Sequence, residues 1–322
     1  MALPDRPAAS SIGTLVPGAV LALALPWLLQ ALQMDFYLSV ASRVVVYAIA
    51  ATSLNLVLGY GGMVSLGHAA FVGLGSYVTG ILLAEGVTGF GVHLVATVAI
   101  TALMALVIGA ISLRTRGVYF IMITLAFAQM LFYLANSVKG YGGDEGLTLR
   151  ARSLLPFGID LKNGIAFYYV ALCVLAAALF ALARFVPSRL GRAVLAGRDD
   201  EVRAEALGFA TFRYKLAIFV AAGALAGIAG ALSVNLQGYV SPNALHWTQS
   251  GTLLVMVILG GVGSVWGGLA GALVLLLLQE VLAAYTQYWE FWTGWVLLAV
   301  VLFARRGLAG LLFDLRTRLA AR

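Results

Sequence analysis

The three histidines and the one cysteine are the residues with the widest chemical reach in this sequence. His68, His93 and His246 lie far apart, and no H-E-x-x-H motif occurs. Cys173 lies inside an apolar run, which leaves neither a disulfide nor a cysteine-based metal site. None of the three lysines forms the Gly-Lys-Ser/Thr of a phosphate-binding loop. We therefore expect no catalytic residue, no metal site and no cofactor bound by this chain, ATP included.

A second group consists of polar residues and one glycine that lie inside long apolar stretches. Polar groups are costly in lipid, so they usually face other helices or a cavity. For each of them an interhelical hydrogen bond is the simpler role, and for the histidine a neutral packing role is simpler than gating or proton relay. The alternative is a path through the membrane. The candidates for that path are Asn55, Ser65, Gly67, His68, Thr124 and Gln129.

Long uncharged stretches set the class of protein. Hydrophobic residues make up 62% of the 322 and charged residues only 10%, against about 45–50% and about 25% in soluble domains. No Asp, Glu, Lys or Arg occurs between Lys215 and Glu280, and shorter gaps of this kind recur along the chain. Since about 20 apolar residues cross a bilayer as a helix, the sequence predicts an all-α, polytopic transmembrane helical bundle.

Ten apolar segments are the candidate spans of one transmembrane domain, 1–322, with a membrane region at 12–305. The stretch 244–284 could instead form one long helix. The first segment could be a cleaved signal peptide, although it is long for one and lacks a small-x-small cleavage site. The ten segments are 12–34, 41–58, 63–84, 92–113, 117–137, 164–186, 214–236, 244–263, 265–284 and 289–305.

The positive charges orient these segments. With ten spans and both termini inside, fifteen of the twenty Lys and Arg residues lie on the cytoplasmic side, as the positive-inside rule requires. Nine spans would place the five C-terminal arginines outside. We therefore predict that the loop 187–213 and the tail 306–322 are cytoplasmic. The net charge of +7 follows the loops and not one soluble face, so we expect contact with membrane lipid and none with nucleic acid.

Glycines mark two further features. The segments 58–62 and 259–263 resemble a pair of glycine-broken helices, and corresponding breaks in two halves of a chain can mark a transport path. Gly223-x-x-x-Gly227 and Gly267-x-x-x-Gly271 have the small-residue spacing that lets helix backbones approach closely. Ordinary bundle packing is the simpler role for these two pairs.

The loop 187–213 contains a short amphipathic segment. Between Asp199 and Leu207 the apolar residues Val202, Ala206 and Leu207 fall at helical spacing, acidic residues suit the first turn, and Gly208 suits the end. Such a helix either lies on lipid headgroups or its own chain, or docks a cytoplasmic partner. On the other side, Asp144 and Glu145 form an acidic turn, which is either simply solvated or a docking point.

Several motifs, in order, make the chain similar to the permeases of ABC importers. Residues 191–208, GRAVLAGRDDEVRAEALG, resemble the coupling loop of those permeases. Residues 53–71, SLNLVLGYGGMVSLGHAAF, are very similar to the early signature of the Liv-type branched-chain amino acid permeases, and favour the M-type subunit over its H-type sister. Further matches lie at 114–120, 124–129, 142–147 and 260–264.

The resemblance covers about residues 40–305 and implies an ABC importer permease fold in a bacterial inner membrane. It also implies an H-type sister permease, two cytoplasmic ATPases that hold ATP and Mg²⁺, and an external binding protein that docks near Asp144 and Glu145. Family loops often read Gly-Gly-Ser-Asp-Gly where this chain has Gly-Gly-Asp-Glu-Gly. The residues implied in ATPase coupling are Gly191, Arg192, Arg198, Asp199, Asp200, Val202, Ala206, Leu207 and Gly208.

Alternatives differ in cargo or in energy source. Similar subunits serve importers of urea, amides and aromatic acids, so the resemblance leaves the cargo open among these and the branched-chain amino acids. An ion-coupled secondary transporter commonly keeps charged residues near the membrane midplane, and the long runs here have none well inside. An intramembrane enzyme would need a nucleophile with a base or paired metal ligands, which no span offers.

Overall fold

The structure is a computed structural model that describes residues 12–149, 151–155 and 160–303. The expected cytoplasmic N-terminus and the tail 306–322 lie outside these ranges, so their location stays a prediction. Ten helices of the described part overlap the ten expected apolar segments, with some boundaries shifted by several residues. They are α1 (Ile12–Ala31), α2 (Asp35–Asn55), α3 (His68–Ala84), α4 (Phe90–Ser112), α5 (Val118–Ser137), α6 (Gly164–Phe185), α9 (Thr211–Gln237), α10 (Trp247–Gly260), α11 (Gly267–Tyr285) and α12 (Trp289–Phe303).

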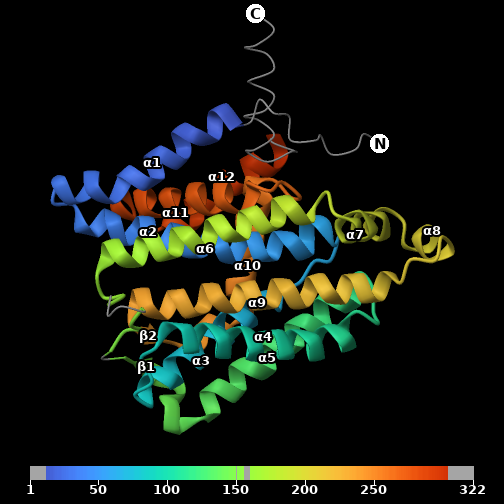
Figure 1. The fold of residues 1–322 in the computed structure, drawn as a ribbon, viewed down its shortest axis with the longest axis horizontal. Helices are drawn as coiled ribbons and strands as arrows, with labels where there is room; N and C mark the ends of the chain where they lie inside the picture. The colour runs from blue at the N-terminus through green and yellow to red at the C-terminus, as the bar shows by residue number, and fades with distance from the viewer. Residues whose placement is uncertain (1–11, 150, 156–159, 304–322) are drawn as a thin grey trace, which may run out of the picture.

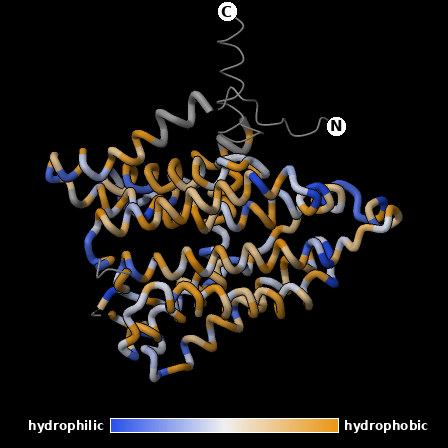
Figure 2. Tube along the Cα trace, viewed as in Figure 1, coloured by the Kyte–Doolittle hydropathy of each residue, from blue (hydrophilic) through white to orange (hydrophobic). Residues whose placement is uncertain are grey.

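Six of these helices are long and apolar enough to cross a membrane by length and composition, counting α2 together with the π-helical turn that follows it. They are α2, α4, α5, α6, α9 and α11; α3 and α10 are apolar but shorter. Hydrophobic residues run along the helices and hydrophilic residues gather toward their ends (Figure 2). The fold is therefore an all-α, multi-span membrane bundle, and the count of ten crossings remains a prediction.

The bundle has two hydrophobic cores that share α9, which lies between them in Figure 1. One core packs α2 and α6 with α9, α10 and α11. The other packs α3, α4 and α5 against the opposite side of α9. Because α9 belongs to both cores, a displacement of this helix would change the packing in both halves of the molecule.

Glycines allow the helix backbones to approach each other closely. A methyl group at Gly75 of α3 would lie 2.2 Å from the Gly227 carbonyl oxygen of α9, and one at Gly271 of α11 would lie 1.7 Å from the Met256 carbonyl oxygen of α10. Both helix pairs therefore touch backbone to backbone. The spacing at 223–227 and 267–271 was expected to allow this approach, and the packing role is confirmed.

The two ends of the bundle differ, and each carries a short structured segment. At one end, the α8 end, lie α7 (Arg189–Asp199) and α8 (Glu201–Ala206). At the other, the β1 end, β1 (Leu147–Thr148) pairs antiparallel with β2 (Tyr239–Val240). The turns η3 (Lys139–Tyr141), η4 (Gly143–Glu145) and η6 (Pro242–Leu245) lie in the segments next to these strands.

Two helices are interrupted by glycine-rich segments. The π-helical turn η2 (Leu56–Tyr60) ends α2, and irregular backbone follows until α3 begins at His68. α10 ends at Gly260, and α11 begins only at Gly267. The stretch 244–284 is therefore two helices and not one. We refer to η2 and the segment 261–266 together as the paired breaks.

One ion pair lies inside the helical region. Arg43, which the sequence places on an outer loop, lies eight positions into α2, because that helix already begins at Asp35. Its guanidinium Nη2 contacts the Glu280 carboxylate of α11 at 2.9 Å. Charged side chains among apolar helices are costly unless they pair, and here each charge compensates the other.

Candidate functional site

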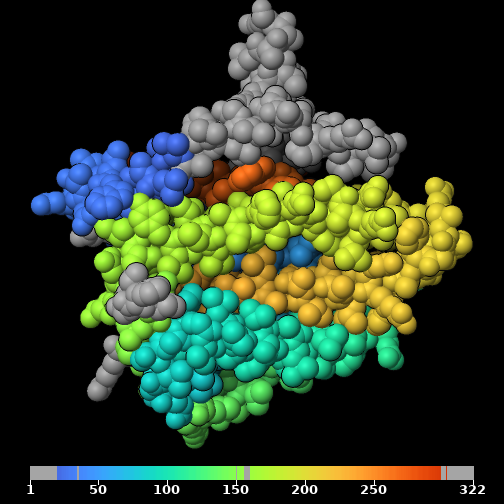
Figure 3. Space-filling view, viewed as in Figure 1, coloured from blue at the N-terminus to red at the C-terminus, as the bar shows by residue number. Residues whose placement is uncertain are grey.

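The helix α8 exposes an apolar face at the end of the molecule, where α7 and α8 project from the helical body (Figure 3). Val202 and Leu207 are 70% and 71% exposed, and Ala206 is exposed beside them. Ala204 is the buried residue of α8, at 2% exposed. These three exposed residues, called the α8 face below, are covered by nothing in the described part of the chain.

The expected helix over 199–207 is shorter in the structure. Asp199 ends α7, and Asp200 adopts an extended conformation with φ −156°. Its side chain accepts a hydrogen bond from the Arg203 amide at 3.0 Å, which makes it the N-cap of a new helix. The acidic residues therefore separate two helices, and Gly208 follows α8 with a φ of +85°.

Ion pairs hold α8 against the rest of the chain. The Glu201 carboxylate contacts Lys215 of α9 at 2.8 Å and Arg116, from the turn between α4 and α5, at 3.2 Å. The Thr211 hydroxyl donates to Glu205 at 2.7 Å. These contacts attach α8 to α9, the helix that both cores share.

The helix α7 connects this end to the interior. Ser188 caps it by accepting from the Gly191 amide at 3.1 Å, and Gly191 packs directly on the Phe185 carbonyl. Arg192 is exposed. Arg198 turns inward: its Nη1 donates to the Gly59 carbonyl of η2 at 2.8 Å. The last carbonyls of a helix lack partners within it, and the guanidinium supplies one.

The paired breaks contact each other directly. A methyl group at Gly59 would lie 2.5 Å from the Gly263 nitrogen. The Asn55 side chain joins the two segments, accepting from the Gly263 amide at 2.9 Å and donating to the Ser264 carbonyl at 2.7 Å. Because Asn55 is fully buried, it satisfies irregular backbone that lipid could not. The expected pair of glycine-broken segments forms one contact region.

The other predicted path residues surround the start of α3. His68 is buried and its Nε2 lies 2.8 Å from the Ser53 hydroxyl. Ser65 accepts from the Gly67 amide, and a methyl group at Gly67 would lie 2.4 Å from the Thr124 carbonyl oxygen. These side chains therefore pack the junction of α2, α3 and α5. Thr124 bonds within α5, and the half-buried Gln129 has no hydrogen bond within the described part of the chain.

The acidic turn lies at the β1 end, far from these contacts. Asp144 and Glu145 are exposed on η4. The Tyr239 hydroxyl of β2 donates to the Glu145 carbonyl, which ties the turn to the strand pair. Nearby, the Tyr141 hydroxyl donates to the Glu85 carboxylate at 3.2 Å, and this hydrogen bond raises the pKa of Tyr141. The turn is thus an exposed surface feature whose position the strand pair fixes.

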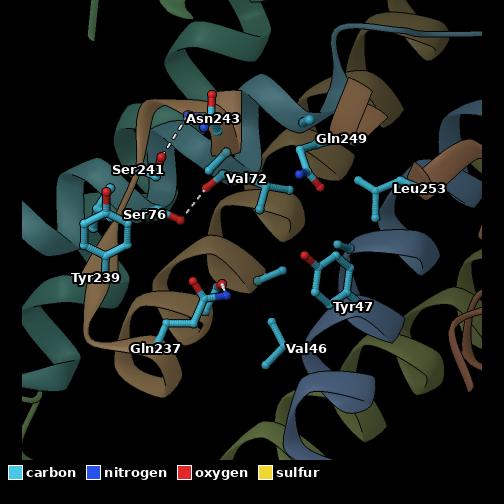
Figure 4. Close-up of a pocket in the computed structure, with 16 residues that line it drawn as sticks. Val46, Tyr47, Val72, Ser76, Gln237, Tyr239, Ser241, Asn243, Gln249 and Leu253 are labelled. Carbon is cyan, nitrogen blue, oxygen red and sulfur yellow. Dashed lines mark hydrogen bonds between the residues drawn. The ribbon is translucent and has the colours of Figure 1, made fainter. Parts of the chain in front are cut away.

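A cavity of about 200 Å³ lies between α2, α3, α9 and α10, with β2 and η6 along one edge. Side chains from all of these elements surround it in Figure 4. None of its lining residues was among the predicted path residues. The sequence did carry a signal, because uncharged amides and hydroxyls gather in 233–249 between two apolar spans. The polar side chains in the lining are Tyr47, Ser76, Ser233, Gln237, Tyr239, Ser241, Asn243 and Gln249.

The cavity adjoins the predicted path residues through Ala69. Ala69 lines the cavity and follows His68 in the first turn of α3. Its amide donates to the Ser250 hydroxyl of α10 at 2.8 Å. The start of α3 therefore joins the cavity lining to the predicted path residue His68. Together these features define a multi-span membrane protein with a cavity between its helices and, within the described part of the chain, an uncovered apolar face at one end.

Comparison with known proteins gives the family. The model for the permease component of the branched-chain amino acid transport system matches residues 36–305. The chain belongs to this family of permease components, which confirms the resemblance seen in the motifs. No solved structure matches the chain significantly.

Curated relatives agree with the family. The chain is 29% identical over 318 residues to the high-affinity branched-chain amino acid transport system permease protein LivM of Escherichia coli K12, covering 91% of this chain and 74% of that protein. It is 28% identical to LivM of Salmonella typhimurium LT2, covering 90% and 72%. It is 25% identical to LivH of Escherichia coli K12, covering 82% and 91%. Greater similarity to LivM supports the M-type expectation.

Proposed function

We propose that this chain forms, with an H-type sister permease, the translocation pathway of an importer for branched-chain amino acids, driven by ATP hydrolysed on two cytoplasmic ATPase subunits. The relatives named LivM and LivH support the permease pair and the cargo. Ten spans in a bacterial inner membrane, with both termini and the α8 end in the cytoplasm, complete the proposal. An external binding protein would deliver cargo at the β1 end, near Asp144 and Glu145.

The observation that carries the proposal is the contact of Arg198 with Gly59. It connects α7, next to the uncovered α8 face, to the paired breaks inside the bundle. π-Helical turns occur frequently at functional sites, and packed interfaces tend to have discrete alternative arrangements. A partner that moved α7 and α8 would therefore act on η2 through one bond and on segment 261–266 through Asn55.

Two features support an external energy source: the sequence has no phosphate-binding loop, and the α8 face is exposed. The sequence has no phosphate-binding loop, so ATP and Mg²⁺ would be held by the partner ATPases. The α8 face is apolar and small, and an amphipathic helix of this kind fits a hydrophobic groove. The ion pairs of Glu201 would keep α8 oriented while the ATPase engages it.

Reconstitution of the whole complex tests the proposal. Liposomes carrying this chain, the sister permease and the two ATPases, supplied with binding protein outside, should accumulate labelled leucine only with ATP and Mg²⁺ at the ATPase side. The purified chain alone should bind no ATP. Uptake driven by a proton or sodium gradient without ATP would contradict the proposal and favour a secondary transporter.

Competition in the same liposomes tests the cargo. Unlabelled isoleucine and valine should compete with leucine, whereas urea, a short amide and an aromatic acid should not. Transport of one of these three compounds, with no transport of leucine, would replace the cargo while keeping the ATP-driven mechanism.

A further inference from the structure

The cavity between α2, α3, α9 and α10 is large enough for a small molecule. Its volume is about 200 Å³, and about 10–15 Å³ of such space holds one water molecule. Ser233 and Gln237 reach it from α9, and Tyr239 from β2, so it extends toward the β1 end. By the proposed orientation, that end faces the binding protein.

The lining carries no formal charge. Among the sixteen described residues that line the cavity, none is Asp, Glu, Lys, Arg or His. A ligand with a net charge would lose hydration there without gaining a counter-charge, which is costly. A ligand with balanced charges needs instead both hydrogen-bond donors and acceptors close together. The occupant that this lining suits is therefore neutral overall.

Several polar groups in the lining remain available to such a ligand. The side-chain amides of Gln249 and Asn243 make no hydrogen bond within the described part of the chain; Asn243 donates to Ser241 through its backbone amide. The side-chain amide of Gln237 makes one long hydrogen bond, 3.3 Å, to Ser233. Each amide offers two donors and an acceptor. Gln237 and Asn243 are exposed and Gln249 is half-buried, so the three amides offer donors to a carboxylate and acceptors to an ammonium group. In Figure 4 the side chains of Gln237, Gln249 and Tyr47 surround the same space.

The remaining walls are aliphatic. Val46 of α2, Val72 of α3 and Leu253 of α10 line the cavity together with alanines. Small-molecule sites commonly combine apolar walls with a few polar groups that fix orientation. A branched aliphatic side chain would contact these walls while its amino and carboxyl groups contact the amides.

We infer that this cavity is a cargo subsite for a zwitterionic amino acid with an aliphatic side chain, entered from the β1 end. The inference rests on the proposed function and assigns its cargo to named residues. The bond from the Ala69 amide to Ser250 closes the inner side of the subsite. Release toward the α8 end requires α3 and α10 to separate there, next to the paired breaks.

Filling the cavity tests the inference in the reconstituted complex. Val72→Phe should reduce leucine uptake at least tenfold while the complex still co-purifies, because the ring occupies the cargo space. Val78→Phe is the matched control: Val78 is half-buried on the same helix and does not line the cavity. It should transport like the wild type. Equal transport by both phenylalanine variants would overturn the inference, because cargo would then not pass through this cavity.

A change of selectivity gives a second readout that a purely structural role would not move. Leu253→Ala widens the aliphatic wall, and should raise uptake of phenylalanine relative to leucine by about tenfold, the scale on which pocket contacts discriminate. Unchanged selectivity in a complex that transports leucine would overturn the subsite alone. A wild-type complex that moved no aliphatic amino acid would overturn the proposed function, and the subsite with it.

Discussion

The guanidinium of Arg198 bonds in two directions. One nitrogen donates to the Gly59 carbonyl at 2.8 Å, and two others donate to the Asp199 carboxylate at 3.1 and 2.9 Å. Its side chain also covers Gly62: a methyl group there would lie 2.5 Å from Arg198 Cγ, and the φ of +67° independently favours glycine. Lysine could not reproduce this geometry, because it lacks the planar fork of arginine. Arg198 therefore connects α7 to η2 through its hydrogen bond to Gly59.

Arg198→Ala should uncouple transport from ATP hydrolysis. Hydrogen bonds to charged groups contribute about 1.5–3 kcal/mol, so we expect leucine moved per ATP hydrolysed to fall about tenfold while the ATPases still co-purify. Arg189→Ala is the matched control, since Arg189 is exposed on the same helix and is not among the residues implied in coupling. The ratio of uptake to phosphate release measures the effect. An unchanged ratio in Arg198→Ala would remove this residue from the coupling route.

At this scale the sequence reveals which residues are unusual but not what they contact. Asn55 is a polar residue in an apolar run, and its burial follows from the cost of polar groups in lipid. Its partners lie 208 and 209 positions away, which no local pattern encodes. The cavity amides escaped prediction for the same reason: Gln237 and Gln249 line one cavity only because α9 and α10 both pack against α2 and α3.

The α8 face is the element on which docking depends. Ala206→Glu should reduce co-purification of the ATPases at least tenfold, because a carboxylate forced into an apolar groove without a partner costs several kcal/mol. The membrane region should stay folded, since Ala206 is exposed. Ala151→Glu, an exposed alanine toward the β1 end, is the control. Normal co-purification and normal uptake in Ala206→Glu would move the docking surface to the turn around Arg116.

Elements were predictable where apolar periodicity and length decide them. All ten apolar segments form helices, because buried or lipid-facing backbone must satisfy its own hydrogen bonds. The split of α7 from α8 at Asp200 was not predicted, since an acidic residue suits both the first turn of a helix and its N-cap. The π-helical form of η2 was also unforeseen, because its geometry depends on the close approach of Gly59 to segment 261–266.

Sidedness is a property of the whole molecule, and cysteine labelling tests it. In intact cells an impermeant thiol reagent should label Thr148→Cys and leave Leu190→Cys unlabelled, because these exposed residues lie at opposite ends of the bundle. Ser153 would be a poor reporter: it is fully buried and bonded to His93. The exposed Cys173 must first be replaced. Labelling of Leu190→Cys from outside would reverse the proposed orientation.

The ion pair between Arg43 and Glu280 has a consequence for how the chain is made. The two residues are 237 positions apart. At a synthesis rate of about 5–20 residues per second, roughly 10–50 s pass between the appearance of one charge and the appearance of its partner. During that interval α2 carries an uncompensated arginine. Among the described residues Glu280 is the carboxylate that contacts Arg43, so a chain cut before α11 would lack this ion pair.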